Sequence, residues 1–391
     1  MSLRGTNQEL GRPFNRRIVL ELIRRHGQLA RNEIANRTGL TVQTISNIVR
    51  ELEDDGYLIS ARLKPKGRGL PPSSLSINPD GGHAFGIQIT PISIEVALIN
   101  LGGIIIAVTR EPVENPSPKL AFAIIAKLVS GIRNQHPRAR LLGAGLAMPG
   151  PFGVESMSFI GPTTLTGWQD VDVRHEVEKA TGLPTFIEID MAAAALGEQL
   201  YGHGNGLSDY YYLFFGFGLG GTMVHDGEAV RGNWGNAGEF GHLTVVTGGE
   251  LCACGNKGCL ERYVSLEAFG RRNLTQAAWV DEITPIFASA IRMLENLYDP
   301  QTIVLGGLAP RSLLHLLARL ESKLGNSIAS RRDRIEPRLI VASLSEDSVL
   351  RGAAALAVRG ALAPHEGRMF KDPRTQTPLK GVAHEPATLG S

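Results

Sequence analysis

The hydrophobic pattern near the N-terminus changes from helical to strand-like within 80 residues. Apolar positions between Arg16 and Arg25 recur with a helical period, a second short helix is expected over 31–38, and Thr41 can cap a third. β-rich runs at 56–59 and 75–77 follow, so residues 1–80 are expected to form a winged helix-turn-helix. The buried face of the third helix is expected to contain Val42, Ile45, Ile48, Val49 and Leu52.

Beyond residue 80 the pattern alternates strands with helices. It predicts strands or β-rich runs within 83–107, at 185–190, 211–217, 223–230 and 302–307, a strand ending at Met148, and helices at 118–135, 191–201 and up to 324. The fold class is therefore α/β. We expect residues 81–363 to form two lobes, the second over about 191–348, with a cleft where strand ends and helix starts meet.

Composition and charge narrow the function classes. The 391 residues carry a net charge of only +2, which excludes a uniformly basic chain and an acidic solvating chain. Residues 1–72 hold 13 Lys and Arg against 7 Asp and Glu, so positive charge gathers in the winged module. No membrane span or signal-peptide core is recognisable, and we expect a cytoplasmic protein without membrane insertion. Residues 364–391 are proline-rich and are expected to be a disordered tail.

The winged module carries side chains suited to double-stranded DNA. The exposed face of the third helix is expected to present Gln43, Thr44, Ser46, Asn47 and Arg50 to base edges in a major groove. The wing carries four cations and no carboxylate lies within 56–79, which argues against a module that only mediates protein contacts. Arg68, between two glycines, is expected to enter a narrow minor groove.

The three cysteines of the chain lie within eight residues. Cys252, Cys254 and Cys259, together with His242, form the ligand set of a closed tetrahedral zinc site, and glycines among them allow a tight loop. Four protein ligands leave no open position for catalysis, so a structural Zn²⁺ is expected. Ordinary buried or reactive thiols are the alternative.

Three carboxylates and a glycine-rich segment are further candidates. Asp190 stands where a strand meets a helix, and Glu239 and Glu261 are close to the proposed zinc ligands. Each can accept hydrogen bonds from a sugar hydroxyl or act as a base, and Asp190 can equally be a helix cap. Residues 216–221 can offer backbone N–H groups to a phosphate or form a tight hairpin.

Together these stretches resemble the ROK family, which contains bacterial sugar kinases and sugar-responsive transcriptional repressors of actin-like, ribonuclease H-like two-lobe fold. The resemblance spans about 83–360, and residues 12–79 resemble the DNA-binding domain of the repressor branch. The segments that carry it are 148–151, 166–168, 237–242, 252–261, 303–307 and 352–355. By resemblance, Asp190 corresponds to the kinases' catalytic Asp, and Glu239, His242 and Glu261 to sugar-binding residues.

The chain departs from the family's kinases at both phosphate motifs. Gln88 replaces an Asp, and Thr90, Pro91 and Ile92 replace two glycines and a Thr; Pro91 removes a backbone donor. Phe217 takes the place of a Thr in the second motif. On the sugar side, Ile189 stands where the family usually has an Asn. The departures predict a degraded ATP site and no catalytic residues.

The leading hypothesis is a sugar-responsive DNA-binding regulator, expected to repress carbohydrate genes in a bacterial nucleoid. It would bind operator DNA as a homodimer or homotetramer and respond to a sugar in its cleft. An ATP-dependent sugar kinase that uses Asp190 is the alternative from another class. A third possibility is an adaptor regulated by a protein partner without any sugar.

Overall fold

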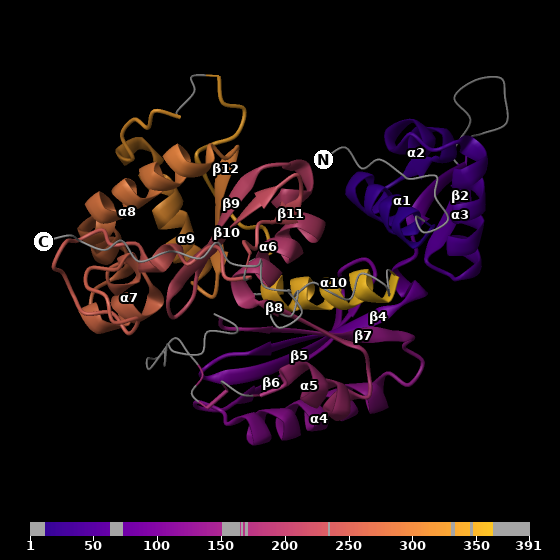
Figure 1. Cartoon of the computed structure of the whole chain (residues 1–391), viewed down its shortest axis with the longest axis horizontal. Coiled ribbons are helices and arrows are strands. Elements are labelled where there is room, and N and C mark those ends of the chain that lie inside the picture. The colour runs from indigo at the N-terminus through magenta and orange to yellow at the C-terminus, as the bar shows by residue number, and fades with distance from the viewer. Residues whose placement is uncertain are drawn as a thin grey trace, which may run out of the picture.

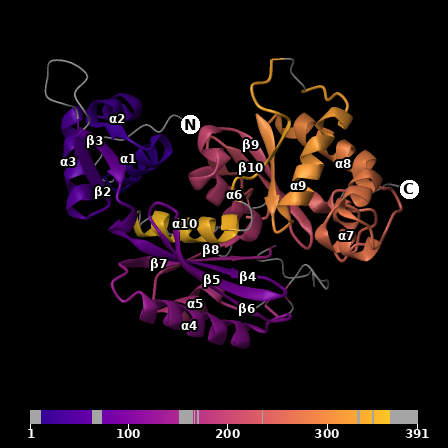
Figure 2. The ribbon, with the colours of Figure 1, turned by 180° about the vertical axis from the view of Figure 1, so that it is seen from behind.

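The computed structural model describes residues 12–62, 73–150, 165, 167–168, 171–233, 235–329, 333–344 and 347–362. These residues form one winged domain and two α/β lobes, seen from opposite sides in Figures 1 and 2. The expected tail at 364–391 and the expected wing tip with Lys64, Lys66 and Arg68 lie outside the described residues. Within the described part, no helix is long and apolar enough to span a bilayer.

The N-terminal domain combines three helices with a small sheet. Its elements are α1 (Arg12–His26), β1 (Leu29–Ala30), α2 (Arg31–Thr38), α3 (Val42–Asp54), β2 (Leu58–Arg62) and β3 (Ser73–Ile77). The sheet has the order β1-β3-β2, and β2 and β3 are antiparallel, as a wing requires. Gly39 ends α2 in the left-handed region, and the Thr41 side chain accepts a hydrogen bond from Thr44 N at 3.1 Å.

The buried face of α3 differs from the expected one at its first residue. Ile45, Ile48, Val49 and Leu52 are at most 3% exposed, but Val42 is 49% exposed, so its expected burial is wrong. Val42 is the first residue of the helix, and a side chain there is directed back past the N-terminus. It therefore extends beyond the turns that pack against α1 and α2.

The two lobes share one strand order. The first sheet is ordered β6-β5-β4-β7-β8 and the second β11-β10-β9-β12-β13, so each has three antiparallel strands followed by two parallel ones. The first contains β4 (His83–Ile89), β5 (Ser93–Asn100), β6 (Ile105–Pro112), β7 (Leu141–Met148) and β8 (Thr185–Ile189). The second contains β9 (Tyr210–Phe215), β10 (Leu219–His225), β11 (Glu228–Ala229), β12 (Thr302–Gly307) and β13 (Leu339–Val341).

Helices cover both faces of the two sheets. The outer layers are α4 (Pro118–Gln135) and α5 (Val173–Thr181) on the first sheet, and α7 (Leu266–Arg272), α8 (Gln276–Tyr298) and α9 (Arg311–Ala318) beside the second (Figure 1). Between the lobes lie α6 (Asp190–Tyr201) and α10 (Ser348–Leu362), which pack against each other. α10 also packs on β4 and β7, so the last described helix returns to the first sheet.

One apolar cluster joins the winged domain to the first lobe. Buried residues of α1 and α3 belong to the same cluster as Ala84 of β4, Ala97 of β5 and Val358 of α10. The second lobe has a separate core around Trp279, Phe287 and Leu305. The winged domain therefore packs against α10, the helix that also contacts α6 between the lobes.

Candidate functional site

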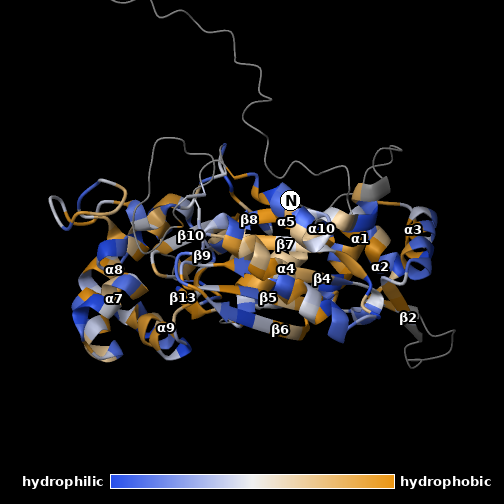
Figure 3. Cartoon of the chain, turned by 90° about the horizontal axis from the view of Figure 1, so that it is seen from below, coloured by the Kyte–Doolittle hydropathy of each residue, from blue (hydrophilic) through white to orange (hydrophobic). Residues whose placement is uncertain are grey.

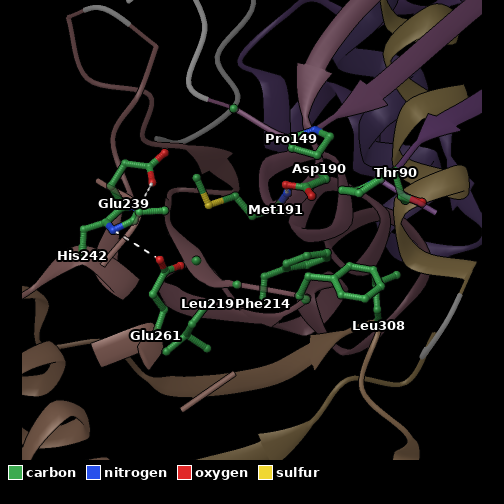
Figure 4. Close-up of a pocket in the computed structure, with 17 residues that line it drawn as sticks. Thr90, Pro149, Asp190, Met191, Phe214, Leu219, Glu239, His242, Glu261 and Leu308 are labelled. Atoms are coloured by element: carbon green, nitrogen blue, oxygen red, sulfur yellow. Dashed lines mark hydrogen bonds and ion pairs between the residues drawn. The ribbon is translucent and has the colours of Figure 1, made fainter. Parts of the chain in front are cut away.

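A pocket opens between the two lobes, and elements of both contribute to it (Figure 4). The first lobe supplies loops that follow β4 and β7, and the second supplies the β9–β10 turn and the segment around His242. α6 begins at the pocket. Its lining consists of Thr90, Pro91, Pro149, Gly150, Asp190, Met191, Phe214, Gly216, Phe217, Gly218, Leu219, Gly220, Glu239, His242, Ala253, Glu261 and Leu308.

Asp190 lies at the start of α6, directly after β8. Its Oδ1 accepts a hydrogen bond from the backbone N–H of Met191 at 2.7 Å, but the helix cap residue is Ile189. Burial raises the pKa of Asp190 to about 6, although the hydrogen bond from Met191 opposes that shift. A carboxylate in this position can accept a hydroxyl proton or a hydrogen bond from a ligand.

Glu239, His242 and Glu261 lie together on one side of the pocket. Glu239 Oε2 is 3.8 Å from His242 Nε2, and Glu261 Oε1 is 3.6 Å from His242 Nδ1 (Figure 4). Burial, followed by the charges of Asp190 and Glu261, raises the pKa of Glu239 to about 7. All four residues expected to bind a sugar thus line one pocket, and their sugar-binding role stays a prediction.

The expected zinc ligands come together beside this wall. One ligand atom from each of His242, Cys252, Cys254 and Cys259 lies within 4.8 Å of the other three. Cys254 Sγ is 3.6 Å from Cys259 Sγ, and Cys252 Sγ is 3.6 Å from His242 Nδ1. Tetrahedral zinc with thiolate bonds of ~2.3 Å separates sulfurs by about 3.8 Å, so the donor set fits Zn²⁺.

Backbone geometry fixes the loop that carries these ligands. Cys252 N–H donates to Asn256 O at 2.8 Å, and residues 251 and 257 form an isolated β-bridge. Gly258 has a φ of +79°, and a Cβ there would meet Val246 O at 1.7 Å. Only glycine fits, because any side chain would displace the neighbouring Cys259.

Gly238 has a similar role beside Glu239. Its φ is +106°, and a Cβ would meet the carbonyl oxygen of Gly221 at 1.9 Å. Gly221 N–H donates to Gly238 O at 3.1 Å, which holds the segment directly against β10. The glycine preceding Glu239 thus allows the carboxylate to lie at the pocket wall.

The opposite wall is formed in part by the turn between β4 and β5. Thr90 N–H donates to Ser93 O at 2.9 Å, and the N–H groups of Ile92 and Ser93 donate to Thr90 Oγ1 at 3.3 and 3.0 Å. Pro91 has no N–H. Every backbone donor of residues 90–93 is therefore occupied within the turn, and none is left for a phosphate.

Gln88 and Phe217 occupy two other positions of the phosphate motifs, and only one of them reaches the pocket. Gln88 of β4 is 2% exposed, its Nε2 has no hydrogen-bond partner, and it is not among the residues that line the pocket. Phe217 does line the pocket. The glycine-rich turn is shorter than expected because β10 begins at Leu219 rather than Met223, so that Gly220 and Gly221 are strand residues.

The expected DNA-binding residues lie on α3, apart from Arg68, which is outside the described residues. Gln43, Asn47 and Arg50 are exposed, and Thr44 and Ser46 are partly exposed. Two other arginines of the domain are paired with carboxylates: Arg16 with Glu51 and Asp55, and Arg31 with Glu53. The contact of these α3 side chains with DNA stays a prediction.

An ion cluster that sequence reasoning missed connects three parts of the chain. Arg359 of α10 is 5% exposed and donates to Glu21 of α1 at 3.4 Å and to Glu228 of β11 at 3.2 Å. Arg17 of α1 also pairs with Glu228 at 3.3 Å. No local motif marks these residues, since the contacts join positions that are between 131 and 338 residues apart.

The winged domain and the two lobes with their interlobe pocket define the class: a winged helix-turn-helix joined to a two-lobe, actin-like domain. The ROK family model matches residues 84–283, and a model described as winged helix-turn-helix DNA-binding matches residues 15–59. The chain belongs to the ROK family. The expected fold class is confirmed.

Named relatives include both regulators and kinases. The xylose repressor of Caldicellulosiruptor bescii is 30% identical over 342 residues, which cover 78% of this chain and 85% of the repressor. A glucokinase of Streptomyces coelicolor is 31% identical over 191 residues, covering 49% of this chain and 58% of the kinase. A crystal structure of a ROK family transcriptional regulator, a homologue of the E. coli MLC protein, aligns with a TM-score of 0.71 at 22% identity, over 92% of this chain and 99% of that one.

Proposed function

We propose that this protein is a sugar-responsive transcriptional repressor of carbohydrate genes. One observation carries the proposal: the same chain has a winged domain with an exposed polar helix face and a polar interlobe pocket with Asp190, Glu239 and Glu261. The named xylose repressor relative matches 78% of this chain, whereas the glucokinase matches 49%. A bacterial cytoplasmic location at the nucleoid follows from this proposal.

The proposed effector is a sugar or sugar derivative. Among the described residues that line the pocket there is no Lys or Arg, so its carboxylates suit hydroxyl donors, and charge-assisted hydrogen bonds are the stronger kind. Ile189, at the usual Asn position, is 3% exposed and offers only apolar surface beside Asp190. The effector therefore lacks the hydroxyl that an amide there would bind, or it is bound without that contact.

Zinc is proposed as a structural cofactor beside the pocket wall that carries Glu239, His242 and Glu261. Its ligands would be His242, Cys252, Cys254 and Cys259, and when bound it supplies a fixed cross-link rather than a catalytic position. Glu261 lies 3.1 Å from Cys252 Sγ and 3.6 Å from His242 Nδ1. The position of Glu261 thus depends on the loop that carries the ligands.

Loss of ATP chemistry is the second part of the proposal. The turn at 90–93 uses all its donors internally, and Phe217 brings a ring to the wall where a hydroxyl is expected in kinases. The specific observation that favours the kinase alternative is Asp190, whose pKa of about 6 suits a general base. Sugar-dependent ADP release that Asp190→Asn abolishes would establish the kinase.

The ion cluster of Arg17, Glu21, Glu228 and Arg359 provides a route between pocket and DNA. β10 begins at Leu219 in the pocket, and its far end pairs with β11, where Glu228 contacts Arg359 and Arg17. Closure of the lobes on a sugar would move β11 relative to α1. In a homodimer or homotetramer, that movement would change the spacing of two α3 helices on half-sites about 10 bp apart or a multiple of this.

The experiment that tests the function is capture of sheared genomic DNA from the source organism, followed by sequencing, with and without candidate sugars. The proposal predicts discrete palindromic sites beside sugar uptake or catabolism genes, with occupancy changed by one sugar. Diffuse, salt-labile retention in every sample would contradict it.

A further inference from the structure

Val42 is an exposed apolar side chain on an otherwise polar helix face. It is 49% exposed at the first position of α3, while Gln43 and Asn47 beside it are also exposed. In Figure 3, α3 lies at the end of the molecule opposite α7 and α8, so neither lobe covers it. The apolar residues of α3 that hold the fold, such as Ile45 and Val49, are buried on the other side.

Hydrogen bonding leaves few side chains of α3 available for base edges. The hydroxyls of Thr41 and Thr44 bond to each other at 2.8 Å, and Thr41 also caps the helix. Ser46 Oγ donates to Val42 O at 2.8 Å. The hydroxyls at 41, 44 and 46 are therefore engaged in the helix and its cap.

The two amides of α3 form a linked pair. Gln43 Nε2 donates to Asn47 Oδ1 at 3.3 Å, which orients Asn47 and leaves its NH₂ group and one acceptor lone pair free. An amide that both donates and accepts matches N7 and the N6 amino group of adenine. A neighbouring apolar methyl matches the 5-methyl group of thymine, which only a T·A or A·T pair presents in the major groove.

We propose that α3 reads A·T base pairs, with Val42 against a thymine methyl and the Gln43–Asn47 amide pair on a nearby adenine. The inference rests on the proposed DNA-binding function and specifies its ligand. Gln43 and Asn47 are one helical turn apart, and Val42 and Ser46 form the adjacent row, so both contacts fall within about two base pairs.

Thymine contact is tested on an operator obtained by the genomic capture. Each thymine of one half-site, and its symmetry mate, is replaced in turn by deoxyuridine, which lacks only the methyl group. For the wild-type protein, one such symmetric replacement should weaken binding about 15-fold, because each half-site returns the equivalent of one methyl group to water at about 4-fold each. Val42→Ala, which changes both half-site contacts, should bind the normal operator about 15-fold more weakly and be insensitive to the same replacement.

The adenine contact is tested with 7-deazaadenine, which lacks the N7 acceptor. Replacement at one adenine should weaken wild-type binding at least 5-fold, and Asn47→Ala should remove that sensitivity. Val108→Ala is the matched control, because Val108 is 54% exposed on β6, far from α3 in the fold; it should respond to both modified operators as the wild type does.

Three outcomes would overturn the inference. Wild-type binding that is insensitive to deoxyuridine at every position excludes a methyl contact, and equal sensitivity of Val42→Ala and wild type excludes Val42 as its source. Insensitivity to 7-deazaadenine excludes adenine recognition. These results require a specific operator, so they leave the proposed function standing. A protein that captures no discrete genomic sites would contradict both the proposed function and this inference.

Discussion

The two walls of the interlobe pocket offer a ligand very different chemistry. One wall carries Glu239, His242 and Glu261, and Asp190 at the start of α6 adds a third carboxylate; the oxygens of these groups have few internal partners. The other carries Thr90 and Pro91, whose turn satisfies its own donors, and the β9–β10 turn adds the ring of Phe217 to the pocket. The carboxylates that suit hydroxyls line the pocket. The backbone donors that would suit a phosphate are hydrogen-bonded within the turn at 90–93, and Phe217 stands where a hydroxyl is expected in kinases. The contrast supports the proposed role in ligand sensing over phosphoryl transfer.

The largest expected effect comes from removing a zinc ligand behind the polar wall. Cys259→Ala should lose the bound metal and with it the sugar response, because a buried ligand is removed from a closed site. Metal content by atomic absorption and melting temperature are the measurements. Leu251→Ser is the control in the same loop, since Leu251 is 64% exposed and is no ligand. A full zinc complement in Cys259→Ala would refute the ligand assignment.

Next, a paired substitution compares the two walls directly. Glu239→Gln should weaken sugar binding about 10- to 150-fold, because it removes a charge-assisted acceptor of about 1.5–3 kcal/mol. Thr90→Ala on the other wall should change affinity less than 2-fold. Calorimetric titration measures both, and free-state DNA binding should be normal in both. Equal losses from the two walls would contradict the comparison.

A third variant asks whether the polar wall communicates with the winged domain through Glu228. Glu228→Gln weakens the contacts with Arg17 and Arg359 and leaves the pocket intact. Sugar affinity should stay within 2-fold, while the sugar-induced change in DNA affinity, expected at about 5- to 150-fold, should fall at least 3-fold. Glu111→Gln, which loses an exposed pair with Lys127, serves as the control. Unchanged coupling would exclude this route.

The pH dependence of sugar binding should be smaller and has a defined sign. The raised pKa of Asp190, about 6, means that the carboxylate is mostly ionised at pH 7 and mostly protonated at pH 5. Hydroxyl binding should therefore weaken several-fold as pH falls through 6. Asp190→Asn should lose this step, and the step that Glu239 contributes should move to lower pH, because the Asp190 charge no longer raises the pKa of Glu239.

Stability should respond to Asp190 in the opposite direction. Its folded-state pKa lies above the ordinary value of 3.8, so the folded state binds the proton more tightly than the unfolded chain. The contribution to the free energy of unfolding is full below pH 4 and is lost as pH rises through 6. Chemical denaturation of wild type and Asp190→Asn between pH 4 and 7, without sugar, measures this contribution. The wild type should gain stability relative to Asp190→Asn as the pH falls. A relative loss of stability at low pH would contradict the raised pKa of Asp190.

The smallest expected effect concerns ATP. Addition of Mg-ATP should change neither melting temperature nor sugar affinity measurably, because the turn at 90–93 has no donor left for a phosphate. Thermal denaturation with and without the nucleotide, beside a sugar-dependent ADP assay, provides the test. An increase of several degrees in the melting temperature with ATP would show that the wall with Thr90 and Pro91 binds the nucleotide.

Local sequence signals predicted much of the site. The zinc cysteines lie within eight residues, and Asp190 stands at a strand–helix junction that the hydrophobic pattern marks. The recognition helix and its Thr41 cap were likewise readable from a helical period and a capping residue. Such features depend on neighbours in the sequence, which is why one sequence suffices to predict them.

Features that depend on tertiary packing were not predictable. The α8 helix was not expected, and Pro285 lies inside it; Pro285 is exposed, so the carbonyl it frees faces solvent. The Glu21–Arg359 contact joins residues 338 positions apart. Val42 was expected in the core because the hydrophobic period shows which face of a helix is apolar. It does not show at which residue the elements that pack against that face end.

The central claim is that a sugar on the polar wall controls DNA binding, and one measurement tests it most directly. The fraction of a captured operator bound is measured against sugar concentration for wild type and Glu239→Gln. The account predicts a saturable change for the wild type and, for Glu239→Gln, the same sugar-free DNA affinity with the response shifted at least 10-fold to higher sugar. Identical response curves for the two proteins would contradict it.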